Sequence, residues 1–324
     1  MARGEPVGTP GRCRAAVLGS PIAHSLSPVL HRAAYTALGL TGWSYEAVEV
    51  DEAGLAGWLA GLDHRAERGW AGLSLTMPLK RAVIPLLTEI SELAVAVGAV
   101  NTVVFASGPG DGPSGDGVLL RGENTDVHGV VAALAEAGVA EVGCGAILGA
   151  GATAASAVAA LVRLGCRRPV VYARSAARAQ AAVTAGARLG ADVRLAPLAS
   201  FPGSGLAGGP DAGGNGAGAA GNGTPQVVIS TLPGGAAGSL LGQDLDAALA
   251  GSRPVLLDVV YAPWPTPLAE AWGRAGAPVV GGFTMLLHQA VAQVELMTGR
   301  QAPVEVMRAA LSAELARRTA TPSG

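Results

Sequence analysis

The stretch that decides the fold of this 324-residue chain is GAILGAGAT, residues 145–153. Its apolar first part, 145–148, predicts a short buried strand, and the residues that follow predict a helix over 152–164. Between a strand and a helix, a glycine turn brings backbone NH groups and the helix N-terminus close to a pyrophosphate. The sixth position of the G-x-G-x-x-G fingerprint is Ala154, which the fingerprint permits. We therefore expect a dinucleotide to bind at this turn, with tight packing in a glycine-rich chain as the alternative. The expected cofactor-binding residues are Gly149, Ala150, Gly151, Ala152 and Thr153.

The end of the next predicted strand, 169–173, indicates which dinucleotide binds. An NAD enzyme has an acidic residue there for the ribose 2′-OH, whereas Ala173, Arg174 and Ser175 offer a guanidinium and a hydroxyl group suited to a 2′-phosphate. Arg178 follows about one helical turn after Arg174 and can clamp the same phosphate. The pattern favours NADP. The alternative is that Arg174 and Arg178 are two ordinary surface arginines that bind no cofactor.

Strand and helix patterns also alternate through the first part of the chain. A helix is expected to begin after Ser27, a suitable N-cap, with Pro28 at its first position. The other predicted elements are strands at 15–18, 45–50 and 71–77 and a helix at 55–62. This alternation predicts a mainly parallel sheet.

The second part of the chain continues the alternation. Strands are predicted at 226–231 and 254–260, and helices at 266–275, 285–298 and 304–317. Two Gly-rich segments, 107–117 and 201–224, cannot bury enough apolar surface to offset the entropy of ordering, so both are expected to be flexible surface insertions. A mobile tail through about Pro10 precedes the first strand. The length of the chain favours two domains in an α/β fold.

Composition and charge argue against several classes of partner. The formal charge is −2, from 22 basic and 24 acidic residues, so no overall positive field attracts nucleic acid or anionic lipid. The three cysteines, Cys13, Cys144 and Cys166, have no CxxC spacing, which argues against disulfides and a zinc site and fits a reducing cytoplasm. The apolar run 147–162 is too short to cross a membrane, and no signal peptide is evident. We expect no metal ion, no nucleic acid and no membrane.

Polar residues gather in further segments where a buried core would not need them. Ser25 and Ser27 stand at a helix start, and Lys80 follows a strand. Others lie after apolar or turn segments or in an apolar helix: Thr76, Asn101, Asp126 and Gln289. Capping, solvent exposure and turn formation would each explain one of them. A substrate with several hydroxyl groups and a carboxylate would need such donors and acceptors, with Lys80 and Asp126 as one acid–base pair.

Seven segments, in the same order, resemble the motifs of the shikimate dehydrogenase family. They are GSPIAHSLSP followed by His31, GLSLTMPLK, GAVNT, GENTD, STLPG, DVVY and QA, at 19–28, 72–80, 98–102, 122–126, 230–234, 258–261 and 289–290. The match is specific, since it runs from about residue 15 to residue 300.

The resemblance implies an α/β fold of two lobes. The first is an N-terminal βα substrate-binding domain, residues 1–125, completed by C-terminal helices from about 284 to 324. The second is a Rossmann-type NADP-binding domain, residues 126–283. The family's C-terminal motifs add three residues to the expected cofactor site, namely Thr231, Val259 and Gly282.

The resemblance also implies an activity, the NADPH-dependent reduction of 3-dehydroshikimate to shikimate in aromatic amino acid biosynthesis. Lys80 would be the principal acid–base group and Asp126 its partner. The substrate's carboxylate and hydroxyl groups would be held by Ser25, Ser27, Thr76, Asn101, Tyr261 and Gln289.

Two alternatives remain at this point. A quinate or dual shikimate/quinate dehydrogenase shares most of these motifs, and Ser25, Ser27 and Arg174 favour shikimate and NADP. A non-catalytic NADP-binding regulatory protein is the alternative of another class, against which the presence of both Lys80 and Asp126 argues. We expect a cytoplasmic enzyme that is a monomer or a homodimer.

Overall fold

The computed structural model describes residues 13–62, 69–109, 116–201, 224–241 and 243–320. The chain divides into two compact units. The first comprises the chain through Val95, then Ala99–Thr125, and the chain from Leu286 onward. The second comprises Ala96–Gly98 and Asp126–Met285. The predicted tail through Pro10 lies outside the described residues.

The first unit is built on a six-stranded sheet with the order β2-β1-β3-β5-β6-β4. The strands are β1 (Cys13–Gly19), β2 (Ser44–Glu49), β3 (Gly69–Leu75), β4 (Glu89–Ile90), β5 (Thr102–Pro109) and β6 (Asp116–Glu123). β1 is parallel to β2 and β3, and β4 is parallel to β6, whereas β5 is antiparallel to β3 and β6. The sheet is therefore mainly parallel, with one reversed strand inside it.

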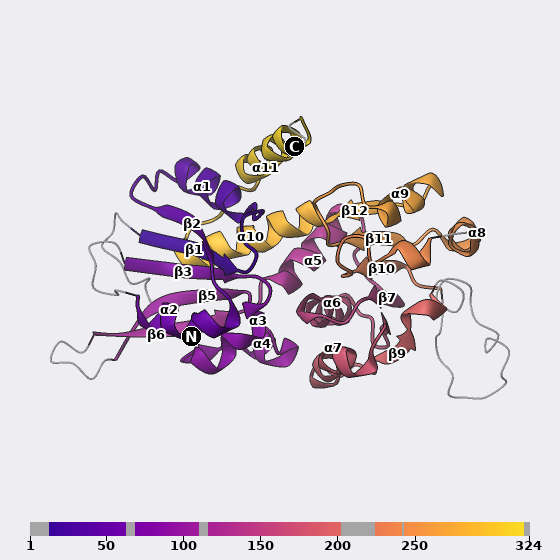
Figure 1. The fold of residues 1–324 in the computed structure, drawn as a ribbon, viewed down its shortest axis with the longest axis horizontal. Helices are drawn as coiled ribbons and strands as arrows, with labels where there is room; N and C mark the ends of the chain where they lie inside the picture. The colour runs from indigo at the N-terminus through magenta and orange to yellow at the C-terminus, as the bar shows by residue number, and fades with distance from the viewer. Residues whose placement is uncertain (1–12, 63–68, 110–115, 202–223, 242, 321–324) are drawn as a thin grey trace. The chain divides into compact units, whose positions relative to one another are not determined.

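The helices of the first unit follow the strands along the chain. They are α1 (Ser27–Ala37), α2 (Glu52–Ala60), α3 (Leu79–Ala82) and α11 (Val304–Ala320), with α4 (Glu92–Val97) and α10 (Gly282–Thr298) each shared with the second unit, and the short 3₁₀ helix η1 (Ile84–Leu86). α1 and α11 lie side by side (Figure 1). The C-terminal helices thus complete the first unit.

Two helix starts differ from the sequence prediction. α1 begins at Ser27 itself, because the side chain of Ser27 bonds to Tyr45 while the Ser25 hydroxyl accepts from the Ser27 NH at 3.3 Å. α2 begins three residues before the predicted 55–62 range, because the Asp51 carboxylate caps it by accepting from the Gly54 NH at 2.8 Å. A local hydrogen bond sets each boundary.

The first predicted Gly-rich insertion, 107–117, is partly regular structure. β5 and β6 pair through Ser107–Val118, Gly108–Gly117 and Pro109–Asp116, so these backbone segments extend a hairpin. Only 110–115 lies outside the described residues. The expectation of a flexible insertion is wrong for these paired segments, because cross-strand pairing supplies backbone hydrogen bonds that composition does not reveal.

The second unit holds a six-stranded parallel sheet with the order β12-β11-β10-β7-β8-β9. Its strands are β7 (Gly145–Leu148), β8 (Val170–Ala173), β9 (Arg194–Pro197), β10 (Val227–Ser230), β11 (Val255–Asp258) and β12 (Val279–Gly281). Counted from β7, this is the doubly wound order 3-2-1-4-5-6 of dinucleotide-binding folds. The predicted α/β fold class with a Rossmann-type unit is confirmed.

Helices cover both faces of the second sheet. They are α5 (Asp126–Glu136), α6 (Ala152–Arg163), α7 (Ala176–Arg188), α8 (Gln243–Ser252) and α9 (Pro267–Arg274), with two short 3₁₀ helices, η2 (Leu198–Ser200) and η4 (Gly238–Leu240). Right-handed crossovers from β7 run in opposite directions along the sheet, which places α6 and α7 on one face and α8 and α9 on the other (Figure 1). The strand order reverses between β7 and β10, where dinucleotides bind in such folds.

The second predicted insertion, 201–224, begins in the core. Phe201 is buried, meets Tyr172 edge-on at 5.1 Å between ring centroids and stacks on Trp272 at 6.5 Å. Phe201, the first residue of the predicted insertion, is therefore part of the core, and residues 202–223 lie outside the described residues.

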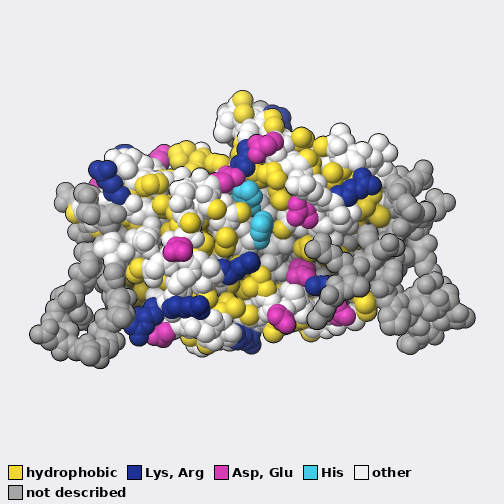
Figure 2. All heavy atoms as spheres, turned by 180° about the vertical axis from the view of Figure 1, so that it is seen from behind, with side chains coloured by type: hydrophobic (Ala, Val, Ile, Leu, Met, Phe, Trp, Pro, Cys, Tyr) yellow, Lys and Arg dark blue, Asp and Glu magenta, His cyan; other side chains and the backbone are white. Residues whose placement is uncertain are grey.

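In the part of the chain that the structure describes, no helix combines the length and apolar character needed to cross a bilayer. Basic and acidic side chains are interspersed on the face shown in Figure 2.

Candidate functional site

The predicted substrate residues of the first unit come from one edge of its sheet. Parallel strands β1 and β3 end at this edge, the antiparallel β5 begins there, and β6 ends there. The loops after β1 and β3 are in contact, since the Ser20 NH donates to the Met77 carbonyl at 3.1 Å. A side chain at Gly19 would overlap Thr76, so the first motif needs glycine at this position. The fold therefore brings the segments that carry Ser25, Ser27 and Thr76 together.

Lys80 is anchored beside Asn101 through the main chain. The Val100 NH donates to the Lys80 carbonyl at 2.8 Å, and Asn101 is the next residue. α3 itself starts where the Leu79 NH bonds to the Thr76 carbonyl at 2.8 Å. Lys80 is half-buried.

Asn101 is the centre of a buried set of amides and hydroxyls. Its amide nitrogen donates to Thr125 Oγ1 at 2.9 Å and to Gln289 Oε1 at 3.4 Å. Its side-chain oxygen accepts from the Thr125 NH at 2.7 Å and from Thr102 Oγ1 at 3.0 Å. Asn101, Thr102, Thr125 and Gln289 are each buried. Two predicted substrate residues, Asn101 and Gln289, thus come within hydrogen-bond distance across 188 residues of sequence.

A second set of buried polar side chains lies around Gln293. Gln293 Oε1 accepts from Ser74 Oγ at 2.8 Å and lies 3.2 Å from His31 Nε2, and Tyr45 Oη donates to Ser74 Oγ at 2.6 Å. Burial lowers the pKa of His31 to about 3, against a smaller opposing effect from the bond to Gln293, so its imidazole is neutral at neutral pH. The sequence indicates His31 and Ser74 only as members of motifs and predicts no role for Gln293 or Tyr45. The one signal for Gln293 is its spacing of four residues from Gln289, which puts both amides on one face of α10.

The remaining predicted substrate and acid–base residues belong to the second unit. Asp126 is the first residue of α5, is 4% exposed, and follows Thr125 directly in the chain. Tyr261 is half-buried, three residues after the last residue of β11.

The turn after β7 has the close backbone packing that a dinucleotide site requires. Gly149 has φ +117°, and a Cβ there would overlap the Thr231 hydroxyl. Thr231 is held in place because its NH donates to the Leu148 carbonyl at 2.7 Å and its hydroxyl donates to the same oxygen at 3.0 Å. α6 begins after Gly151 without a side-chain cap, so no side chain occupies its first NH groups. A pyrophosphate fits the chemistry of this turn.

The residues predicted for the 2′-phosphate lie at the start of α7. Arg174 and Arg178 are both exposed, and Arg174 precedes the helix while Arg178 is in its first turn. Ser175 is the N-cap, since its hydroxyl accepts from the Arg178 NH at 3.4 Å. Ala173 is buried at the end of β8. Ser175 therefore caps α7, a role that was not predicted from the sequence, and the exposed Arg174 and Arg178 are accessible to an anion.

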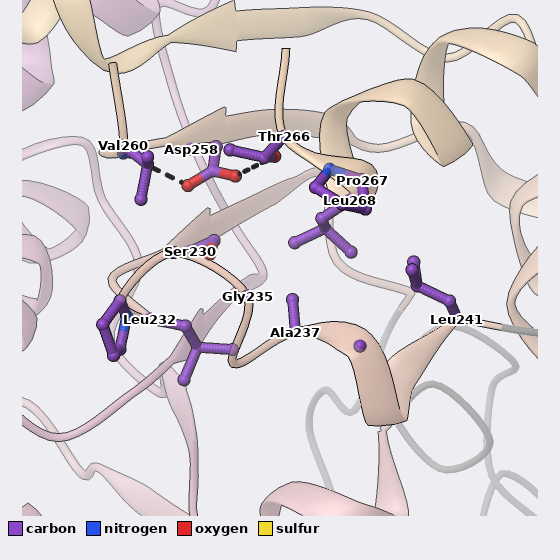
Figure 3. Close-up of a pocket in the computed structure, with 13 residues that line it drawn as sticks. Ser230, Leu232, Gly235, Ala237, Leu241, Asp258, Val260, Thr266, Pro267 and Leu268 are labelled. Atoms are coloured by element: carbon purple, nitrogen blue, oxygen red, sulfur yellow. Dashed lines mark hydrogen bonds between the residues drawn. The ribbon is translucent and has the colours of Figure 1, made fainter. Parts of the chain in front are cut away.

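The backbone after β12 packs on the backbone after β11 as closely as the glycine turn packs on Thr231. A Cβ at Gly282 would overlap the Val259 carbonyl group, so these two predicted cofactor residues are in direct backbone contact. Asp258 fixes the neighbouring loop, because it accepts from the Val260 NH at 3.3 Å and from the Thr266 hydroxyl at 2.6 Å (Figure 3). Burial raises the pKa of Asp258, and the hydrogen bonds from Thr266, Val260 and Ser230 oppose that rise.

A pocket beside Asp258 is lined mainly by apolar side chains. Figure 3 shows Leu232, Ala237, Leu241 and Leu268 around it. Its volume is about 80 Å³, well below the ~300–1,000 Å³ of small-molecule sites. It is too small for a dinucleotide. Among the described residues, no group of three or more His, Cys, Asp or Glu side chains is placed to hold a metal ion.

Comparisons with known proteins agree with this geometry. The profile of the shikimate dehydrogenase substrate binding domain matches residues 17–103, and that of the shikimate 5′-dehydrogenase C-terminal domain matches residues 282–311. A shikimate dehydrogenase (NADP(+)) of Geobacter sp. (strain M21) is 37% identical over 305 residues, which cover 93% of this chain and 94% of that protein.

Solved structures give the same result. The crystal structure of Mycobacterium tuberculosis shikimate dehydrogenase is 41% identical with a TM-score of 0.73, and covers 93% of this chain and 99% of its own. The shikimate 5-dehydrogenase of Thermus thermophilus, in complex with NADP(H) and shikimate, is 28% identical with a TM-score of 0.71, and covers 93% of this chain and 99% of its own. On fold, motifs and similarity along its length, the chain belongs to the shikimate dehydrogenase family.

Proposed function

We propose that this chain catalyses the reversible NADP-dependent interconversion of 3-dehydroshikimate and shikimate. The observation that carries the proposal is the buried hydrogen-bonded set formed by Asn101, Thr125 and Gln289, at the sheet edge where the main chain of Lys80 is anchored. Neutral amides and hydroxyls of this kind both donate and accept, as recognition of a polyhydroxylated ring requires. The family relatives act with NADP(+), and the accessible Arg174 and Arg178 support the same cofactor here.

Each predicted substrate residue then has a chemical role. The Ser25 and Ser27 hydroxyls bind the substrate carboxylate, since Ser25 lies in the loop that leads into α1 and Ser27 is the first residue of that helix. Thr76, Asn101, Gln289 and Tyr261 hold the ring hydroxyls. A buried site that bonds each hydroxyl discriminates strongly against analogues that lack one, because its polar groups would be left unpaired.

Lys80 and Asp126 form the acid–base pair of the proposal. In the reducing direction Lys80 donates a proton to the oxygen of the ketone, and in the oxidising direction it takes the proton back. Asp126 is the second member of the pair. NADPH, when bound, supplies the hydride.

The second unit supplies the groups that bind this cofactor. The turn Gly149–Gly151 and the first NH groups of α6, at Ala152 and Thr153, would hold the pyrophosphate. Arg174 and Arg178, together with Ala173 and Ser175, would hold the 2′-phosphate end. Thr231, Val259 and Gly282 would bind the same cofactor, and Gly149 and Gly282 pack too closely on Thr231 and Val259 to carry a side chain.

The cellular setting proposed from the sequence is the cytoplasm. None of Cys13, Cys144 and Cys166 forms a disulfide, and burial raises the pKa of each thiol. Cysteines outside disulfides, with raised pKa values, are suited to a reducing compartment.

The test is the rate at which the purified protein forms NADPH from shikimate and NADP⁺, followed by absorbance. Quinate in place of shikimate, and NAD⁺ in place of NADP⁺, are the comparisons. The proposal predicts that the pair of shikimate with NADP⁺ has the highest kcat/KM. Comparable turnover of quinate would make the enzyme a dual dehydrogenase, and no reduction of NADP⁺ by either compound would overturn the enzymatic proposal in favour of a non-catalytic NADP-binding protein.

A further inference from the structure

Gln293 lies on α10 in the core of the first unit, is 1% exposed, and has four hydrogen-bond partners from three other elements. Oε1 meets Ser74 Oγ at 2.8 Å and His31 Nε2 at 3.2 Å. Nε2 meets Thr102 Oγ1 at 3.0 Å and the Asn101 carbonyl at 3.3 Å. A side-chain amide has two donor hydrogens and two acceptor lone pairs, so every one of them is used.

These contacts fix the orientation of the amide and of the groups around it. The Asn101 carbonyl can only accept, so the amide nitrogen must face it and Oε1 must face His31. Oε1 can only accept, so His31 carries its proton on Nε2, and its Nδ1 is left to accept from Tyr35 Oη at 3.4 Å. One amide therefore sets the tautomer of a buried histidine and the position of the Asn101 main chain.

Gln293 is connected to the loop of the proposed carboxylate-binding serines by a short chain of hydroxyls. The chain runs from Gln293 to Ser74, from Ser74 to Tyr45 at 2.6 Å, and from Tyr45 to Ser27. The His31 ring stacks on Tyr45 with 3.9 Å between centroids and 16° between planes, which holds the phenol in place. In the other direction Gln293 reaches Asn101 directly. The two proposed substrate contacts are thus joined by a hydrogen-bonded chain that passes through Tyr45, Ser74 and Gln293.

We propose that Gln293 is a positioning residue for shikimate binding. It sets the distance between the Ser27 hydroxyl and the Asn101 amide, and so matches the site to the spacing between the substrate's carboxylate and its ring hydroxyls. It acts through Ser74, Tyr45 and Asn101 without touching the substrate. The inference rests on the proposed function, and specifically on the roles given there to Ser27 and Asn101.

The first test is Gln293→Met, which keeps the length of the side chain and removes all four hydrogen bonds. Val294→Ala is the matched control, because Val294 is fully buried at the next position of α10 and its truncation costs stability without removing a hydrogen bond of the network. We expect Gln293→Met to raise the KM for shikimate about 10-fold, with the KM for NADP⁺ within about twofold of wild type. Val294→Ala should leave both KM values within about twofold while lowering the melting temperature.

The second test is Gln293→Glu, which tests the positioning role of Gln293 even if Gln293→Met fails to fold. A carboxylate cannot donate to the Asn101 carbonyl or to Thr102, whereas a protonated carboxyl group can donate one hydrogen bond. The KM for shikimate of this variant should therefore fall toward the wild-type value as the pH is lowered, and the KM for NADP⁺ should show no such recovery.

The outcomes separate the inference from the function on which it rests. If wild type oxidises shikimate but both Gln293 variants have a shikimate KM equal to that of Val294→Ala, Gln293 is only part of the core. An equal rise in the KM for both ligands would also overturn the inference. If wild type does not oxidise shikimate at all, the proposed function itself fails.

Discussion

The candidate substrate site of the first unit and the candidate cofactor site of the second unit are built differently. In the first unit the candidate site is made of side chains, where amides and hydroxyls from β2, β3, α10 and the residues next to β5 and α5 bond to one another at 2.6–3.4 Å. In the second unit the glycine turn offers backbone, because Gly149 approaches Thr231 and Gly282 approaches Val259 too closely for any Cβ, and the side chains proposed for the cofactor are the exposed Arg174 and Arg178. A cyclic polyol is distinguished by the positions of its hydroxyls, which need placed partners. A pyrophosphate needs only NH groups and close access.

The difference extends to the buried titratable groups. Burial lowers the pKa of His31 in the first unit and raises the pKa of Asp258 in the second, so burial favours the neutral form of each. The first unit should therefore respond to changes of side-chain chemistry, and the second both to changes of volume next to its backbone at Gly149 and to loss of charge at Arg174.

The largest effect is expected from Gly149→Ala. The new Cβ overlaps Thr231, and φ +117° is unfavourable for any residue with a Cβ. The Kd for NADP⁺ should rise about 100-fold or more, because strain of ~3 kcal/mol depopulates the turn that binds it, while the Kd for shikimate stays within about twofold. Calorimetric titration measures both. Gly273→Ala in α9, where a Cβ has no neighbour within 4 Å, is the control. Unchanged NADP⁺ binding would show that the turn does not hold the pyrophosphate.

Arg174→Ala should separate the two cofactors. Loss of a charge-assisted bond to the 2′-phosphate should raise the KM for NADP⁺ about 30-fold and leave the KM for NAD⁺ unchanged. Arg194→Ala removes another exposed arginine of the same unit and should change neither value. Equal effects on the two cofactors would contradict the assignment of Arg174 to the phosphate.

His31 should make the folded state sensitive to acid. Its pKa of about 3 in the folded protein lies below the ~6.5 of an exposed histidine, so the unfolded chain takes up a proton first as the pH falls. The stability due to His31 is complete above pH ~6.5 and is lost as the pH falls toward the folded-state value, by about 2 kcal/mol at pH ~5. Urea unfolding at several pH values measures the slope.

Two variants test whether that slope belongs to His31. His31→Gln should flatten it, while His24→Gln, which removes an exposed histidine, should retain it. Asp258 acts in the opposite direction, because its raised pKa lets the folded state bind a proton before the unfolded chain does. A slope unaffected by His31→Gln would mean that other groups cause it.

The smallest predicted effect comes from the C-terminal helix. Arg318 donates to Glu314 at 2.8 Å and to the His24 carbonyl at 2.9 Å, in the loop that precedes Ser25, whereas Arg317 bonds to Glu314 alone at 2.8 Å. These two arginines lower the pKa of Glu314 to about 2. Arg318→Gln should raise the KM for shikimate about threefold by loosening the loop, and Arg317→Gln should leave it unchanged. Identical kinetics of the two variants would show that the bond to His24 does not position the loop.

Local patterns were sufficient to predict much of the fold. The strand 145–148 and the helix that follows it are observed as β7 and α6, because an apolar run, a glycine turn and helical spacing all lie within about 20 residues. Thr266 and Ala275, the ends of a predicted helix, are the N-cap and C-cap of α9. The β5–β6 hairpin was missed because its glycine-rich inner segment lacks the alternation of apolar residues that predicts a strand.

The sequence predicted which residues belong to the candidate site but not which of them are in contact. Motifs indicated Asn101 and Gln289, but nothing in the sequence places them in contact, since 188 residues separate them. Gln293 was missed because an amide in an apolar helix carries no local signal of its partners, and the bond from Arg318 to His24 spans 294 residues. Long-range hydrogen bonds depend on the folded topology, which residue types alone do not specify.

In the proposed mechanism Lys80 transfers the proton, whereas other residues bind shikimate and NADP⁺. Lys80→Ala tests this assignment most directly, with kcat and the Kd of each ligand measured on the same preparation. We expect the kcat of Lys80→Ala to be at least about 100-fold lower than that of wild type, with the Kd values for shikimate and NADP⁺ within a few-fold of wild type. An unchanged kcat would contradict the role given to Lys80 and the mechanism built on it.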